Sequence, residues 1–220
     1  MDKILITEDG SHVIFGSQNL YVTIAHNVKA TLQFDLEGQK DVTVEVGNNA
    51  YYYGHFATTQ TTDSNFKHSI ILNGKKSQAH FYGTFLSKAK STTNIDIIQH
   101  HKDSHARSYV SVRAVLQEES QSLYKGLIKI EKDAPYSNAH QENKVLIVSS
   151  QAKATSIPSL QILNNEVQCG HGSAISHLDE EQLFYLCSRG VAKDEAKEMI
   201  IKAFLVEQEK PTPPEGYESK

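Results

Sequence analysis

The sequence has no tryptophan, two cysteines and no long apolar run. Two cysteines cannot form a disulfide framework, so we expect a reducing compartment, the cytoplasm. No run approaches the roughly 20 apolar residues of a membrane-spanning helix, and the first residues contain no apolar signal-peptide core. Because 22 basic and 26 acidic residues leave a formal net charge of −4, we expect neither nucleic acid nor a membrane as a partner.

Sequence motifs typical of common enzyme classes are also missing. The sequence has no Walker A lysine motif, no Gly-x-Ser-x-Gly nucleophile elbow and no Cys-x-x-Cys pair. A carbohydrate-active enzyme would need several carboxylates gathered on one strand face, and the acidic residues here are scattered. The sequence therefore predicts a protein without a catalytic site of its own, although a β-helix carbohydrate-active or structural protein stays open as an alternative.

What the chain does have is a long series of short strand patterns. Between residues 12 and 171, runs rich in Val, Ile, Tyr, Phe and Thr recur, with Gly, Asn, Asp and Ser between them. Val42–Val46 and Leu127–Ile130 alternate apolar and polar residues, which is typical of half-buried strands. Turn residues recur about every eight to twelve positions, a spacing that fits a sandwich, a barrel or a solenoid.

Two features favour the solenoid. Strong hairpin signals are scarce, with Asp9-Gly10 and Asn73-Gly74 as the clearest examples. The strands carry many Ser, Thr, Asn, Gln and His residues, as stacked β-helix turns often do. No clean fixed period is visible, so the pattern alone leaves a sandwich open.

Residues after 177 predict two helices. Asp179 is placed to cap the first, Gln182 to complete a capping box, and Gly190 to end it. Residues 192–209 carry an amphipathic stripe. The predicted organisation is a β-body over residues 1–177, a helical region over 178–209 and a disordered, proline-rich tail over 210–220.

The string His171–Val191 resembles the C-terminal signature of the SufB/SufD family, scaffold proteins of the SUF system of iron–sulfur cluster assembly. Val167-Gln-Cys-Gly-His-Gly172 resembles the Val-Lys-Cys-Ser-His-Gly run of the SufD branch. Gly172 and Ile162 also favour SufD, because the SufB type carries Glu and Cys there. The resemblance covers residues 95–206 and suggests a compact form that lacks the long N-terminal region.

The resemblance implies a fold and a function. The fold would be mainly β, a single-stranded parallel, right-handed β-helix with a short C-terminal α-helical hairpin. The function would be that of a non-enzymatic scaffold subunit that pairs with a SufB-like subunit and docks the ABC ATPase SufC. In an alternative, two copies form a compact SufBD-like homodimer. No cofactor would be tightly bound, and an iron–sulfur cluster would rest on the chain only transiently.

Cys169 and His171 are the candidate ligands for iron or for such a cluster. Residues two apart on a strand project from the same face, and thiolate and imidazole both bind iron. Two ligands do not complete a four-coordinate site, so the others would come from a partner. The simpler alternative is that Cys169 is a core residue and His171 a hydrogen-bonded structural residue.

Other conspicuous residues receive structural interpretations. His100, His101 and His105 resemble a metal cluster, but adjacent strand residues face opposite sides. The Tyr51–Tyr53 run is expected to pack in the β-body.

The resemblance also places the ATPase-docking surface on the first helix. The expected contact residues are Leu183, Phe184, Tyr185 and Arg189. Alternatively, Leu183, Phe184 and Leu186 cover the end of the solenoid.

Overall fold

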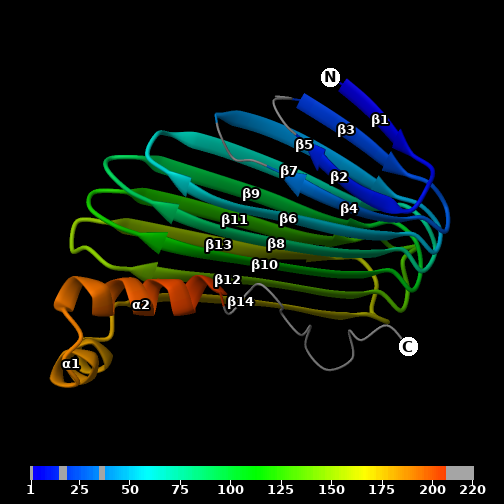
Figure 1. Ribbon diagram of the computed structural model, residues 1–220. Helices are drawn as coiled ribbons and strands as arrows, with labels where there is room; N and C mark the ends of the chain where they lie inside the picture. The colour runs from blue at the N-terminus through cyan, green and yellow to red at the C-terminus, as the bar shows by residue number, and fades with distance from the viewer. Residues whose placement is uncertain (1, 15–18, 35–37, 207–220) are drawn as a thin grey trace.

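The protein is a parallel β-solenoid with two helices at its C-terminal end (Figure 1). The computed structural model describes residues 2–14, 19–34 and 38–206, so the tail predicted over 210–220 lies outside the described residues. Strands alternate between two seven-stranded sheets, with odd-numbered strands in one and even-numbered strands in the other. The predicted fold, mainly β and a parallel β-helix, is confirmed.

The strands are β1 (Asp2–Ile6), β2 (Gly10–Ile14), β3 (Asn19–Ile24), β4 (Lys29–Phe34), β5 (Gln39–Val46), β6 (Tyr51–Gln60), β7 (Ser64–Leu72), β8 (Gln78–Ser87), β9 (Thr92–His101), β10 (Arg107–Leu116), β11 (Gln121–Ile130), β12 (Asn138–Ile147), β13 (Lys153–Ile162) and β14 (Gln168–His177).

The apparent hairpin signals are corners of the solenoid. Asn73-Gly74 joins β7 to β8, which belong to different sheets. Every neighbouring pair within a sheet is parallel, as in β10 with β12, and such strands cannot be joined by a two-residue hairpin. The sandwich alternative built from antiparallel hairpins is therefore wrong.

The absence of a clean sequence period has a structural cause. Register partners in adjacent turns are 22 residues apart at Tyr21 and Thr43, but 32 apart at Lys129 and Gln161. The turns lengthen along the chain while the register continues, so no single period fits the sequence.

The lumen between the sheets is apolar and aromatic in its N-terminal half. Phe34, Phe56, Phe66 and Phe81 meet there with ring centroids 5.5–6.3 Å apart. The same layer holds His68, which is buried against Phe81 with its Nε2 2.9 Å from the Tyr52 hydroxyl. Burial lowers the pKa of His68 from 6.5 to about 3.

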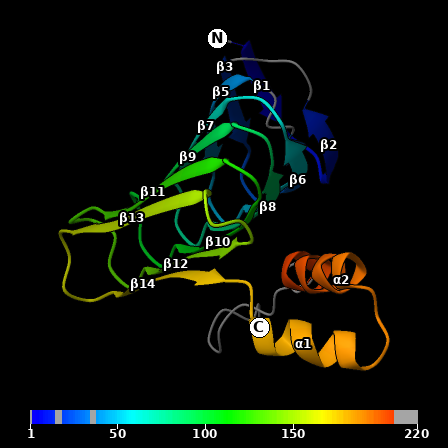
Figure 2. The same ribbon diagram turned by 90° about the vertical axis from the view of Figure 1, so that its left-hand side faces the viewer.

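The two helices form a hairpin that lies on the outer face of the even-numbered sheet. Helix α1 (Glu180–Ser188) begins as expected, because the Asp179 carboxylate accepts from the backbone N–H groups of Glu181 and Gln182. Gly190, with φ of 89°, lies just after its end. Figure 2 shows helix α2 (Lys193–Val206) beside β8 and β10, with α1 below it.

Specific contacts fix α2 to the sheet. Ile201 packs on Val115 and Leu146, and Arg113 Nη1 donates to the Phe204 carbonyl at 2.9 Å. This packing places α2 on the outer face of the even-numbered sheet. Of the first-helix residues expected in the alternative to cover the solenoid end, Phe184 is exposed to solvent. No helix of the described residues is long and apolar enough to cross a membrane.

The buried histidine makes stability depend on pH. The folded state cannot protonate His68 until the pH approaches 3, whereas the unfolded chain protonates it near 6.5. Its contribution to stability is therefore present above pH 6.5 and is lost as the pH falls, at about 1.4 kcal/mol per pH unit.

Between about pH 7.5 and pH 5 the free energy of unfolding of the unchanged protein should fall, and in His68→Gln this fall should be smaller by about 2 kcal/mol. Glutamine still forms hydrogen bonds at this position but does not titrate. Urea unfolding at both pH values measures it, with the exposed His177→Gln as control. An unchanged pH dependence in His68→Gln would contradict the assignment.

Candidate functional site: the open end and its helical hairpin

The C-terminal end of the solenoid is uncovered. β13 and β14 are the last strands of their sheets, and neither has a neighbour on its outer edge among the described residues. Leu160 and Ile162 are in register with the buried Ile128 and Ile130 and point into the lumen, yet they are exposed. An apolar lumen that ends in exposed side chains is typical of a surface that another chain covers.

The two end strands differ in their free backbone groups. In a parallel ladder, alternate residues bond to each side. Gln168 and Leu178 donate toward β12, to Ser137 and Ile147, so the odd-numbered residues of β14 direct their N–H groups to the open edge.

On β13, Lys153 and Leu163 donate inward to the sheet, at Ser120 and Ile130. Its even-numbered residues therefore face the open edge, and one of them, Pro158, has no N–H. The edge of β14 thus offers an uninterrupted row of donors, whereas that of β13 is broken in the middle.

Cys169 and His171 lie on this edge strand and point into the uncovered end of the lumen. They are in register with Ala139 and Gln141 of β12, both of which are buried in the lumen. Cys169 packs beside Ile128 and Ala139, and this burial raises the pKa of its thiol to about 11. His171 is exposed. The thiol is protonated at neutral pH in this state, so coordination requires its proton to leave.

A polar layer lies directly beneath His171. Gln141 Nε2 donates to the Gly126 carbonyl at 3.3 Å, and the Tyr124 hydroxyl is 3.4 Å from Gln141 Oε1. Gln141 and Tyr124 were not among the site residues predicted from the sequence. The sequence pattern that could have identified Gln141 is its polar side chain at an inward position of an alternating strand, between Ala139 and Asn143.

The described residues do not hold a complete metal site by themselves. No three His, Cys, Asp or Glu side chains within those ranges gather closely enough to hold a metal ion. His100 faces outward with its Nε2 2.8 Å from a Glu131 oxygen, whereas His101 is buried beside the Ser108 hydroxyl at 2.7 Å. His105 lies at a corner against Tyr136. The three histidines are thus separated, as the strand period predicts.

The first helix presents two aromatic side chains to solvent. Phe184 is 75% exposed and Tyr185 is 57% exposed, and the Arg189 guanidinium lies 5.3 Å from the centre of the Tyr185 ring. Leu183 is only 3% exposed. A partner could therefore contact the two aromatic residues and Arg189 directly, but the inclusion of Leu183 in that surface is wrong because Leu183 packs inside the molecule.

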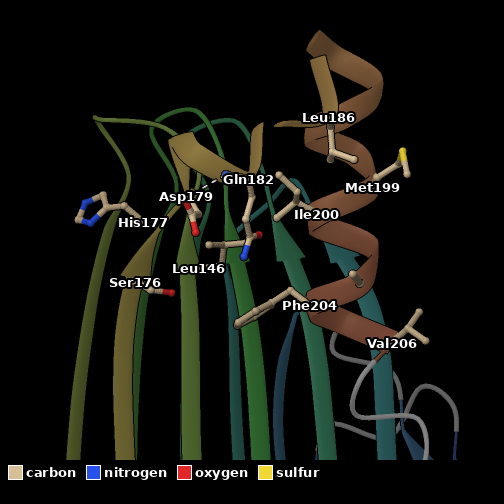
Figure 3. A pocket seen from close by; sticks show the side chains of 11 residues that line it. Leu146, Ser176, His177, Asp179, Gln182, Leu186, Met199, Ile200, Phe204 and Val206 are labelled. Atoms are coloured by element: carbon tan, nitrogen blue, oxygen red, sulfur yellow. Dashed lines mark hydrogen bonds between the residues drawn. The ribbon is translucent and has the colours of Figure 1, made fainter. Parts of the chain in front are cut away.

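A groove of about 880 Å³ runs between the hairpin and the sheet. In Figure 3, Ile200 and Phe204 extend from α2 toward Leu146 and Gln182. Leu186 and Met199 continue its apolar lining, and Ser176 of the edge strand lines it as well. The groove therefore connects the hairpin to the open end of the solenoid.

Comparison with known proteins identifies the family of this chain. The chain matches the family described as SUF system FeS cluster assembly, SufBD core domain, over residues 13–204. It is 31% identical over 135 residues to the iron–sulfur cluster assembly protein SufD of Bacillus subtilis, an alignment that covers 61% of this chain and 31% of that protein. It is 28% identical over 156 residues to SufD of Escherichia coli, with coverages of 64% and 37%.

A SufD protein of Plasmodium falciparum aligns over 93% of this chain at 22% identity, but over only 14% of its own length. The chain thus spans less than two-fifths of each of these three relatives. The family model, in contrast, matches most of the chain, including the edge strands and both helices. The chain therefore belongs to the SufB/SufD family of the SUF iron–sulfur cluster assembly system and is SufD-like.

Proposed function

We propose that this chain is a non-enzymatic scaffold subunit of a cytoplasmic SUF-type complex, in which an iron–sulfur cluster is the cargo. The observation that carries the proposal is the position of Cys169 and His171. Both face the uncovered end of the lumen from a strand whose edge has a continuous row of free donors. The chain supplies part of a coordination site and a surface for the chain that completes it.

The partner at this end is a SufB-like subunit. An exposed edge strand pairs readily with a strand of another chain, and β14 is the better of the two edges because Pro158 interrupts β13. The exposed Leu160, Ile162 and Ile175 would be covered by the same contact. A second copy of this chain is the alternative partner, in a compact homodimeric scaffold.

The ATP-hydrolysing partner is a SufC-like ABC ATPase that docks on the helical hairpin. Phe184 and Tyr185 are large, exposed and adjacent, and Arg189 stacks beside Tyr185. Aromatic and arginine side chains supply most of the binding energy at many interfaces. Because α2 is fixed to β10 by Arg113, movement of the hairpin would be transmitted to the sheet.

At the open end, this chain supplies side-chain ligands to the iron of the cluster. His171 would coordinate iron through a neutral imidazole nitrogen, and Cys169 through a thiolate once iron or a basic group of the partner has displaced its proton. Ligands from the partner complete the coordination. Since neither residue brings a full site, no cofactor is tightly bound to this chain alone.

Removal of one edge donor tests the pairing. Ser173→Pro deletes an N–H that faces the open edge and leaves the bonds between β14 and β12 intact, so it should abolish pairing without unfolding the chain. Multi-angle light scattering of the co-expressed chains measures the assembly. Ser156→Pro, which removes the equivalent donor from the interrupted β13 edge, should have little effect. A folded Ser173→Pro chain that still pairs would exclude the β14 edge.

Truncation of the two aromatic residues tests the docking. Phe184→Ala with Tyr185→Ala should weaken binding of the ATPase by about 2–4 kcal/mol if both are anchors. Calorimetric titration measures the affinity, and circular dichroism checks the β-body. The matched control is Tyr136→Ala, which removes an equally exposed tyrosine from a distant corner. Equal affinity of the double variant and the control would refute the docking surface.

Substitutions of Cys169 and His171, whose side chains point into the lumen from β14, test whether this chain supplies ligands to the cluster. His171→Ala should abolish cluster formation on the assembled complex without affecting assembly or ATPase docking. Cys169→Ser should do the same only if the thiol also coordinates iron. Anaerobic reconstitution, followed by iron content and visible absorbance, distinguishes the cases, with Ser173→Ala as the control on the same row. Normal cluster content in His171→Ala would leave the chain a purely structural subunit.

A further inference from the structure

A polar pocket of about 490 Å³ lies at a corner of the solenoid, and neither of the proposed iron ligands lines it. Arg107, Asn138 and Gln168 line one side; they are register partners and the first residues of β10, β12 and β14. Tyr136 and Glu166, from the corners that precede β12 and β14, line it as well. We refer to this site as the corner pocket.

The strand period places the polar groups of the corner pocket on the outside of the sheet. Asn138 and Gln168 alternate with the inward-facing Ala139 and Cys169. Asn138 Nδ2 donates to Gln168 Oε1 at 3.2 Å, which fixes the two amides against each other. Within the described part of the chain, this bond leaves Asn138 Oδ1 and Gln168 Nε2 available to a ligand, one as an acceptor and the other as a donor.

Two opposite charges line the corner pocket without pairing. Among the described residues, the Arg107 guanidinium has no ion pair and no side-chain hydrogen bond, and the same is true of the Glu166 carboxylate. Arg107 lies two strand spacings from Gln168, about 9.6 Å, so the corner before β14 is held away from it. A cation and an anion kept apart in one pocket match a ligand that carries both charges.

A buried hydroxyl at the corner pocket also lacks a partner. Ser137 lines the pocket and is only 1% exposed, yet its Oγ has no hydrogen-bond partner among the described residues. Buried polar groups are normally hydrogen-bonded, so an unpaired one beside a pocket indicates that a ligand or water supplies the missing partner. The Tyr136 ring packs against His105, with centroids 5.0 Å apart, and limits the pocket on that side.

We propose that the corner pocket binds a free α-amino acid. The carboxylate of the ligand lies against the Arg107 guanidinium, whose planar donors pair with a carboxylate through two parallel hydrogen bonds. Its ammonium group lies against the Glu166 carboxylate. The Asn138 and Gln168 amides and the Ser137 hydroxyl bind the remaining polar atoms. The volume lies within the range of small-molecule pockets, and the proposal does not depend on the proposed function.

Charge favours this class of ligand over simpler ions. A ligand that is only an anion would gain from Arg107 but would be repelled by Glu166, and a simple cation would meet the reverse. A phosphate-bearing ligand would need more positive charge than the one guanidinium that lines the pocket. An α-amino acid carries its two charges on neighbouring groups, so it satisfies both residues at once.

The corner pocket joins the last turn of the solenoid to the turns before it. Arg107 and Asn138 belong to β10 and β12, whereas Glu166 and Gln168 belong to the turn formed by β13 and β14. A ligand bound by both sets of residues binds only when the last turn is in place, so it stabilises that turn.

Titration of the full chain with amino acids tests the proposal. Saturation-transfer NMR with the proteinogenic amino acids, one at a time, should identify at least one that binds, and calorimetry should measure its Kd. Arg107→Gln and Glu166→Gln should each weaken that binding by about tenfold to a hundredfold, because each removes a charged hydrogen-bond partner. Arg107→Lys, which keeps the charge, should weaken it less. Lys153→Gln removes an exposed cation from the opposite corner and should leave the affinity unchanged.

Acetate and methylammonium, each of which carries one of the two charges, are the matched probes and should bind far more weakly than the amino acid. Acetate that binds equally well would make the pocket a simple anion site and overturn the proposal. Absence of binding by every amino acid at millimolar concentration would overturn it too. Equal affinity in a folded Arg107→Gln chain, checked by circular dichroism, would place the ligand elsewhere and refute the assignment.

Discussion

The structure depends on parallel pairing in register between successive turns of the chain. Because each strand sits directly on the equivalent strand of the previous turn, inward positions stay inward from β3 to β14, and every strand needs a partner on both edges. The lumen, the outward rows of side chains and the open end all follow from that pairing. The same pairing sets the direction of the candidate ligands. The side chains of Cys169 and His171 point into the lumen because these residues are in register with the inward-facing Ala139 and Gln141.

Local features of the sequence predicted local structure well. Alternation in Val42–Val46 indicated a half-buried strand, and these residues form part of β5. Asp179 and Gly190 bracketed the first helix correctly because capping depends on a few neighbouring residues. The direction shared by Cys169 and His171 was predictable for the same reason, because a strand has a period of two whatever surrounds it.

Longer-range features were not predictable in this way. The residues Asn73-Gly74 suit a hairpin and a solenoid corner equally, and only the partners of β7 and β8 distinguish the two. Leu183 is buried by tertiary packing of the first helix, which a local sequence pattern does not predict. One sequence pattern indicated which part of the sheet is covered on its outer face, but it was not interpreted in this way. Apolar residues run without alternation in Ala114–Leu116 and Val145–Val148, as expected for strands covered on both faces, and α2 covers the outer face there.

The contrast between the aromatic centre of the lumen and its uncovered end has a consequence for folding. In a solenoid each turn is stabilised mainly by its neighbours, so order spreads from the best-packed turns toward the ends. The rings around Phe66 and Phe81 form the best-packed region, whereas the turn formed by β13 and β14 has a neighbour on one side only. Like the first turn, formed by β1 and β2, this final turn therefore opens more readily than the turns between them. A partner that pairs with β14 would supply the missing neighbour, so completion of the fold and formation of the complex become a single cooperative event.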